Sequence, residues 1–101
     1  MSGADSAVVP ARITLLTQPD CSLCEHAKEV LDRVGADLAL RIDTVDLTSA
    51  EGQRLAAYAH VVFAPGVLLD GAPFSHGRLS ERRLRKALRG RAGARPMQVE
   101  R

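Results

Sequence analysis

The alternation of apolar and polar positions predicts a chain of short strands and amphipathic helices. Ile13-Thr-Leu-Leu-Thr17 is β-branched and apolar, and it stops at Gln18-Pro-Asp20, so it predicts a buried strand followed by a turn. Apolar residues then recur at steps of three and four, which predicts a helix. Gly35 is placed to end this helix as a left-handed cap. The inward stripe of the helix consists of Leu23, Ala27, Val30, Leu31 and Val34.

The middle of the chain predicts a second strand and a second helix. Leu38, Leu40 and Ile42 alternate with polar residues, as in a half-buried strand, and a phase slip before Val45 fits a bulge or a late strand start. Thr48-Ser-Ala-Glu51 matches a capping box, which marks a helix start. The inward face of this helix would be Leu55, Ala56, Ala59 and Val62.

The last third predicts a hairpin and a final helix. Asp70-Gly71 lies between two short apolar runs, a pattern typical of a tight β-hairpin. Ser80 is the expected N-cap of the last helix, whose inward residues are Leu84, Ala87 and Leu88. The element order β-α-β-α-β-β-α predicts an α/β fold in which helices flank a four-stranded mixed sheet. We expect residues 1–11 to form a flexible arm, 12–89 the domain and 90–101 a basic flexible tail.

Composition fits one ordinary globular domain. The chain has 101 residues, of which 46% are hydrophobic and 26% charged. No apolar run approaches the roughly 20 residues that a membrane span needs, and residues 1–10 lack the pattern of a signal peptide. We therefore expect a cytoplasmic protein that does not bind membranes.

Charge is distributed unevenly along the chain. Residues 1–77 carry five Lys or Arg against ten Asp or Glu, whereas residues 78–101 carry nine against two. A basic segment can bind nucleic acid or an acidic protein. None of the three aromatic residues lies in this segment, so it offers no platform for stacking bases, and we do not expect nucleic-acid binding. The arginines of the last helix are expected to form a solvated face, with docking of an acidic protein as the alternative.

The candidate chemistry lies in the only two cysteines, Cys21 and Cys24, at the junction of the first strand and the first helix. The free N–H groups and the positive dipole end of a first helical turn stabilise a thiolate. A free cysteine with a pKa of about 8.5 is only about 3% thiolate at pH 7, so a lower pKa would increase the reactive fraction considerably. We expect Cys21 to be the nucleophile that attacks a substrate disulfide and Cys24 to be the resolving thiol. The charge of Asp20, one residue earlier, should oppose this stabilisation.

Two other functions are compatible with these residues. A cysteine pair can supply half the ligands of an iron–sulfur cluster shared by a dimer, or part of another metal site. The fold can also serve as an interaction module without catalysis. His26, His60 and His76 show no spacing that would make them converge with the cysteines on a metal ion, so we expect no metal ligands among them.

Three landmarks carry a resemblance to a known family. They are Thr17-Gln-Pro-Asp-Cys-Ser-Leu-Cys-Glu-His-Ala27, Ala64-Pro-Gly-Val-Leu-Leu-Asp-Gly71 and Gly77-Arg78. In their order and spacing they resemble a glutaredoxin-like protein of the thioredoxin superfamily, in the small bacterial branch with a Cys-x-Leu-Cys motif. The resemblance covers residues 12–89 and implies a thioredoxin-like fold and thiol-disulfide oxidoreductase activity.

The resemblance also implies a substrate site. Pro65 would be cis and face the dithiol, while the backbone of Ala64 pairs with substrate; Gly77 and Arg78 would complete the binding surface. The chain departs from glutathione-using glutaredoxins, with Gln18 in place of a basic residue, Phe63-Ala64 in place of Thr-Val, and His76-Gly-Arg-Leu79 in place of two glycines and an acidic pair.

The expected partners follow from this chemistry. The substrates would be protein or small-molecule disulfides, and the electron donor would be glutathione or a thioredoxin-type reductase. The dithiol needs no metal or organic cofactor, and we expect a monomer.

Overall fold

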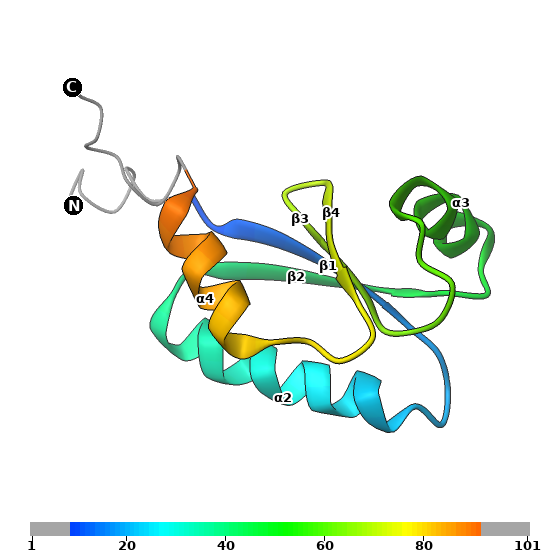
Figure 1. The fold of residues 1–101 in the computed structure, drawn as a ribbon, viewed down its shortest axis with the longest axis horizontal. Helices are drawn as coiled ribbons and strands as arrows, with labels where there is room; N and C mark the ends of the chain where they lie inside the picture. Colours follow the sequence, from blue (N-terminus) through cyan, green and yellow to red (C-terminus); the bar gives the residue numbers. More distant parts are fainter. Residues whose placement is uncertain (1–8, 92–101) are drawn as a thin grey trace.

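The computed structural model of the protein describes residues 9–91, so residues 1–8 of the arm predicted at 1–11 and residues 92–101 of the tail predicted at 90–101 lie outside the described residues. The strands and helices follow the predicted order β-α-β-α-β-β-α, which confirms a thioredoxin-like α/β fold (Figure 1). They are β1 (Ala11–Thr17), α2 (Ser22–Asp37), β2 (Leu40–Asp46), α3 (Ala50–Ala59), β3 (Gly66–Leu69), β4 (Ala72–His76) and α4 (Glu81–Gly90). Between residues 9 and 91, no helix combines the length and the apolar character needed to cross a membrane.

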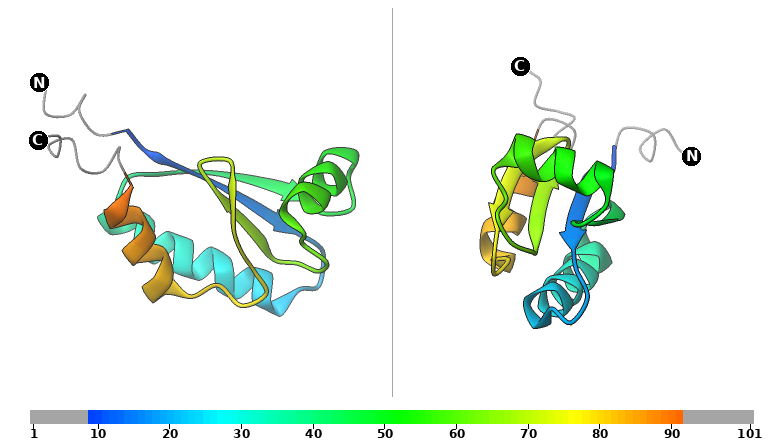
Figure 2. Two further views of the ribbon diagram at one scale, coloured as in Figure 1. Left: turned by 45° about the horizontal axis from the view of Figure 1, so that its top comes forward. Right: turned by 90° about the vertical axis from the view of Figure 1, so that its right-hand side faces the viewer.

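The sheet is mixed and has the strand order β2-β1-β3-β4. Strands β1 and β2 are parallel, whereas β1 pairs antiparallel with β3 and β3 pairs antiparallel with β4. Helices α2 and α4 lie together on one face of the sheet, and α3 lies on the other face near one end (Figures 1 and 2). Strand β1 is therefore an inner strand that has a partner on each edge and a helix on each face.

Two hydrophobic clusters follow from the alternation of side chains along β1. Ile13 and Leu15 face α2 and α4, and Leu16 faces α3; all three side chains are fully buried. The larger cluster also contains Ala27, Val30, Leu31 and Val34 of α2, Val67 of β3, and Leu84 and Leu88 of α4. The smaller cluster surrounds the loop before β3 and includes Cys24, so the candidate site is built into the core at this end of the sheet.

Helix α2 ends differently from the prediction. Gly35 does not cap it: the helix continues to Asp37, and Leu38 is the C-cap, with an extended backbone (φ −129°, ψ 143°). The Leu38 N–H donates to the Val34 carbonyl at 2.8 Å. An extended Leu38 leads the chain directly into β2, so this connection needs no left-handed residue.

Strand β2 is also less buried than predicted, and it has no bulge. Its register with β1 is continuous from Ala11↔Leu40 to Thr17↔Asp46, so the strand starts late, at Leu40. It forms an edge of the sheet, and Ile42 remains 41% exposed.

Helix α3 begins one residue later than the capping-box pattern indicates. Ser49 is the N-cap, and its hydroxyl accepts a hydrogen bond from the Gly52 N–H at 2.9 Å. Thr48 instead donates its N–H and its hydroxyl to Asp46 Oδ1, both at 2.7 Å, which lowers the pKa of Asp46. The helix ends at Ala59, before the left-handed His60, and the predicted inward position of Val62 is wrong because this residue is 83% exposed.

The hairpin and the last helix start as predicted. Asp70 (φ 51°) and Gly71 (φ 84°) both have positive φ, as a two-residue type I′ turn requires. Asp70 Oδ1 accepts the Arg12 N–H at 2.9 Å, and Oδ2 accepts Arg91 Nε at 2.7 Å. These contacts, the first above all, lower the pKa of Asp70. The Ser80 hydroxyl caps α4 by accepting the Arg83 N–H at 3.1 Å.

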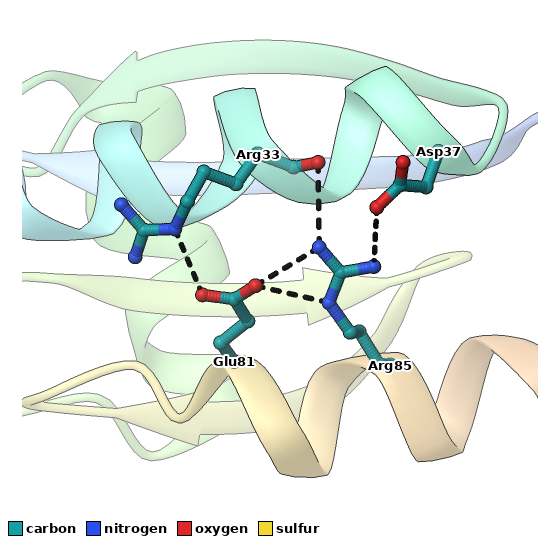
Figure 3. A network of polar contacts seen from close by, with 4 residues as sticks. All are labelled: Arg33, Asp37, Glu81 and Arg85. Carbon is teal, nitrogen blue, oxygen red and sulfur yellow. Dashed lines mark hydrogen bonds and ion pairs between the residues drawn. The ribbon is translucent and has the colours of Figure 1, made fainter.

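A charged network joins α4 to α2 and corrects the expectation of a purely solvated arginine face (Figure 3). Arg33 Nε donates to Glu81 Oε1 at 3.0 Å, and Arg85 contacts Glu81 Oε2 at 2.9 Å. Arg85 also contacts Asp37 Oδ2 at 2.8 Å. The hydrogen bonds from Arg33 and Arg85 lower the pKa of Glu81. Arg85 therefore links the two helices, and its side chain is only 20% exposed.

The end of α2 leads to a stability prediction. Gly35→Ala should raise the free energy of unfolding by about 0.5–1 kcal/mol, because Ala has the higher helix propensity. The added Cβ would lie 3.7 Å from Leu40 Cδ1, an ordinary contact. As a matched control, Gly52→Ala should lower the free energy of unfolding by about 1–3 kcal/mol, because its Cβ would overlap the Asp46 carbonyl. Urea denaturation measures both changes, and a clear loss of stability in Gly35→Ala would contradict the helical assignment.

Candidate active site

The site begins where β1 turns into α2. The chain reverses through Gln18-Pro-Asp20, and Asp20 has a left-handed backbone (φ 54°), which Asp adopts more readily than most residues. Cys21 follows as the N-cap of α2, with an extended backbone (φ −119°, ψ 104°). Its Sγ accepts a hydrogen bond from the Cys24 N–H at 3.1 Å. A cysteine sulfur thus occupies the place that a Ser or Asp oxygen takes at most helix starts.

Cys21 and Cys24 form a disulfide, with their Cα atoms 5.2 Å apart. The two residues differ in exposure. Cys24 is 1% exposed and belongs to the smaller hydrophobic cluster, whereas Cys21 is partly exposed and packs against the edge of that cluster. A reagent from solvent therefore reaches the Cys21 side of the pair more easily than the Cys24 side.

The loop before β3 contributes to the same hydrophobic cluster as the disulfide. The Ala64–Pro65 peptide bond is cis, in agreement with the resemblance. Ala64 is 7% exposed and lies in the same cluster as Cys24, and Pro65 is fully buried. The Pro65 carbonyl accepts the Gly77 N–H at 2.8 Å, which ties this loop to the residue that follows β4.

An apolar rim, formed by Val62 and Phe63, precedes Ala64 and was not predicted. Val62 is 83% and Phe63 53% exposed. The Phe63 ring meets the His76 ring edge to face, with centroids 5.7 Å apart. Gly77 has φ 78°, and a Cβ at this position would lie 3.5 Å from the Phe63 ring. The sequence signal for the rim is the pair of large apolar residues between the end of α3 and Ala64-Pro65.

Arg78 lies in a different environment from Gly77. It lines a cavity of about 370 Å³ between α2 and the start of α4, together with His26, Ser80 and Glu81. Neither cysteine lines this cavity. The Nδ1 atom of His26 is buried without a hydrogen-bond partner among the described residues. Gly77 is therefore in contact with the loop that carries Pro65, whereas Arg78 lines the same cavity as His26.

The charges near the disulfide are few and lie at the surface. Asp20 is exposed and forms no hydrogen bond or ion pair with any residue from 9 to 91. Glu25, in the first turn of α2, pairs with Lys28 Nζ at 3.2 Å. In this described part, no group of three or more His, Cys, Asp or Glu residues could hold a metal ion. The polar group that contacts Cys21 Sγ is thus the backbone N–H of the helix itself.

Comparison with known proteins places this geometry in a family. A search of curated proteins finds no match to the sequence. Among protein families, residues 12–89 match the glutaredoxin-like domain (DUF836). The matched segment extends from β1 into α4 and contains both cysteines and the cis proline. The chain therefore belongs to the glutaredoxin-like domain family.

Proposed function

We propose that the protein is a thiol-disulfide oxidoreductase in which Cys21 is the nucleophile and Cys24 the resolving thiol. One observation carries the proposal: a disulfide joins a partly exposed cysteine at the N-cap of α2 to a buried cysteine one turn later. The family match supports a thiol redox role for this pair. The structure describes the oxidised state of the proposed cycle.

The reductive half of the cycle starts with the reduced dithiol. The Cys21 thiolate attacks one sulfur of a substrate disulfide, forms a mixed disulfide with it, and expels the other substrate sulfur as a thiolate. The Cys24 N–H, which contacts Cys21 Sγ at 3.1 Å in the oxidised protein, is positioned to stabilise the attacking thiolate. The positive end of the α2 dipole acts in the same direction.

Resolution completes the exchange. The Cys24 thiolate attacks Cys21 Sγ, the intramolecular disulfide forms, and the second substrate sulfur leaves as a thiolate. Two electrons have then passed from the dithiol to the substrate. The burial of Cys24 at 1% exposure shields it from external disulfides, so it reacts with the sulfur of its own chain.

The proposed substrate platform is the loop that carries Ala64 and Pro65. Ala64 belongs to the hydrophobic cluster that contains Cys24, which supports a platform close to the dithiol. The apolar rim of Val62 and Phe63 borders the loop and favours disulfides flanked by apolar groups, as in proteins and peptides. Gly77 supports the platform through its hydrogen bond to the Pro65 carbonyl. Arg78 lines the cavity beside His26, away from this loop, so its proposed contact is with a part of the substrate distant from the disulfide.

The oxidised pair must be reduced again by an external donor. Glutathione and a thioredoxin-type reductase are the two donor classes that we propose to test, in the cytoplasmic setting expected from the sequence. Both deliver two electrons through thiol exchange, so the dithiol itself needs no metal or organic cofactor. Recovery of the reduced protein with each donor in turn distinguishes between them.

Serine variants of the two cysteines test the proposed roles. Cys21→Ser should abolish reduction of a model protein disulfide, because the attacking sulfur is lost. Cys24→Ser should accumulate a mixed disulfide between Cys21 and the substrate, because the resolving sulfur is lost. A coupled reduction assay measures the activity, and non-reducing electrophoresis with mass spectrometry detects the trapped species.

Ser22→Ala is the matched control, since it removes a polar side chain beside Cys21 and leaves both sulfurs in place. Full activity in both cysteine variants would disprove the assignment. A brown, dimeric protein after anaerobic purification, with colour that depends on both cysteines, would favour cluster binding instead.

Asp20→Asn tests the electrostatics of the site. The Asp20 charge lies one residue before Cys21 and opposes ionisation of the thiol, so removing it should lower the pKa of Cys21. Asn tolerates the left-handed backbone that Asp20 adopts, and the turn should persist. The expected result is faster alkylation of the reduced protein at neutral pH; unchanged or slower alkylation would show that the Asp20 charge does not act on the thiol.

A further inference from the structure

The free edge of the sheet at β2 has a defined pattern of backbone groups. The Ala39 carbonyl accepts the Ala11 N–H at 3.1 Å, and the Leu47 N–H donates to the Thr17 carbonyl at 2.7 Å, so both odd-numbered residues bond toward β1. Because N–H and C=O groups alternate between the two sides of a strand, those of Leu40, Ile42 and Thr44 point away from β1. In the described sheet, no strand lies beyond β2 to accept them.

The side chains along this edge form a self-complementary pattern. Ile42, at the centre, is 41% exposed and faces α2, where it lines a groove with Leu15 and Leu31. Arg41 and Asp43 flank it, are both exposed, and lie on the opposite face of the strand. Neither forms an ion pair with another residue in the range 9–91.

The register of the sheet adds an unfavourable charge pair at this edge. Arg41 is the direct partner of Arg12 across the parallel β1–β2 pair. Like charges opposite each other destabilise a sheet. Asp70, on the β3 side of Arg12, offsets part of this repulsion. An acidic side chain on the outer side of Arg41 would offset more of it.

We propose that β2 pairs antiparallel with β2 of a second copy of this chain, about a two-fold axis at Ile42. This arrangement sets Ile42 opposite Ile42 of the second copy. It also sets Arg41 opposite Asp43 of the second copy, and Asp43 opposite Arg41 of the second copy. Moving the axis to Arg41 or to Asp43 would oppose like charges, and moving it to Leu40 or to Thr44 would separate Arg41 from Asp43 of the second copy. The axis at Ile42 is the one that forms both opposite-charge pairs.

Hydrogen-bond geometry agrees with this register. Leu40, Ile42 and Thr44 carry the outward groups, so Ile42 and its symmetry mate exchange both of their backbone hydrogen bonds, and Leu40 does so with Thr44. Arg41 and Asp43 then occupy the pairs without hydrogen bonds, where Cα atoms approach to about 4.5 Å and side chains are closest. Opposite charges gain most at these positions.

The groove beside the edge would be covered by the same contact. It measures about 270 Å³ and is lined by Leu15, Lys28, Leu31, Asp32, Ile42 and Thr44. Its apolar floor of Leu15, Leu31 and Ile42 would be shielded from water by the second copy. The paired strands would form one continuous sheet of eight strands.

This dimer would leave both disulfides accessible and does not rest on the proposed function. Cys21 follows the carboxyl end of β1, which runs parallel to β2. Antiparallel pairing of the two β2 strands therefore directs the two Cys21 residues toward opposite ends of the joined sheet. A dimer that shares a metal cluster would instead bring the cysteine pairs together, so the two kinds of dimer are distinguishable. The proposal replaces the monomer expected from the sequence.

Charge reversal tests the register. Sedimentation equilibrium of the wild type over a series of concentrations should show a species of twice the 10.8 kDa chain mass. Arg41→Asp and Asp43→Arg should each weaken dimerisation by roughly tenfold to a hundredfold, because each creates two like-charge pairs. The double variant that combines both changes should dimerise again, and an equimolar mixture of the two single variants should form a mixed dimer.

Arg82→Asp is the matched control for Arg41→Asp, because it makes the same change of net charge on the exposed surface of α4 and should not affect dimerisation. Circular dichroism verifies that each variant is folded. A wild type that remains a monomer up to its solubility limit would overturn the proposal. So would a dimer that persists in both single variants, or one that disappears in Cys24→Ser.

Discussion

The hydrogen bond from the Cys24 N–H to Cys21 Sγ, at 3.1 Å, is the contact on which the account of this site depends. It exists because Cys21 is the N-cap of α2, where the helix has free N–H groups and no carbonyl of its own to receive them. A thiol gains little from such a contact, whereas a thiolate gains a charge-assisted hydrogen bond. The position of one residue at a helix start thus converts an ordinary side chain into a candidate nucleophile.

The rest of the fold fixes that position. Strand β1 is buried on both faces and paired on both edges, so the turn into α2 starts from a rigid point. Helix α2 is held from its other side by the network of Arg33, Asp37, Glu81 and Arg85. The loop of Ala64 and Pro65 packs in the cluster with Cys24 and is tied to Gly77. Core packing and ion pairs therefore act together to keep one sulfur partly exposed and the other buried.

The elements predicted best are those whose signals are local. The strand from Ile13 to Thr17, the Asp70-Gly71 hairpin and the Ser80 cap each depend on a few consecutive residues, and the structure confirms them. The junction that carries Cys21 is of the same kind. The order of the elements then predicted the mixed sheet, because parallel β-α-β units have one favoured hand.

The features that the sequence did not reveal depend on distant contacts. Gly35 fits a left-handed cap by pattern, yet the path of the chain into β2 keeps it helical. Val62 continues an apolar helical stripe, but the left-handed His60 ends the helix before it and leaves it exposed. The sequence around Arg85 predicts a surface cation. In the structure α2 and α4 lie side by side, and Arg85 Nη1 pairs with Asp37 Oδ2 at 2.8 Å. The environment of each of these residues depends on how two elements pack in three dimensions, and a short stretch of sequence does not carry that information.

Stabilisation of the Cys21 thiolate by the helix start is tested most directly by the pKa of Cys21 in the reduced protein, measured from the pH dependence of its alkylation rate with Cys24 replaced by Ser. We expect a pKa below the value of about 8.5 for a free cysteine, because the helix start stabilises the thiolate. A pKa at or above that value would show that the N-cap position does not stabilise the thiolate of Cys21.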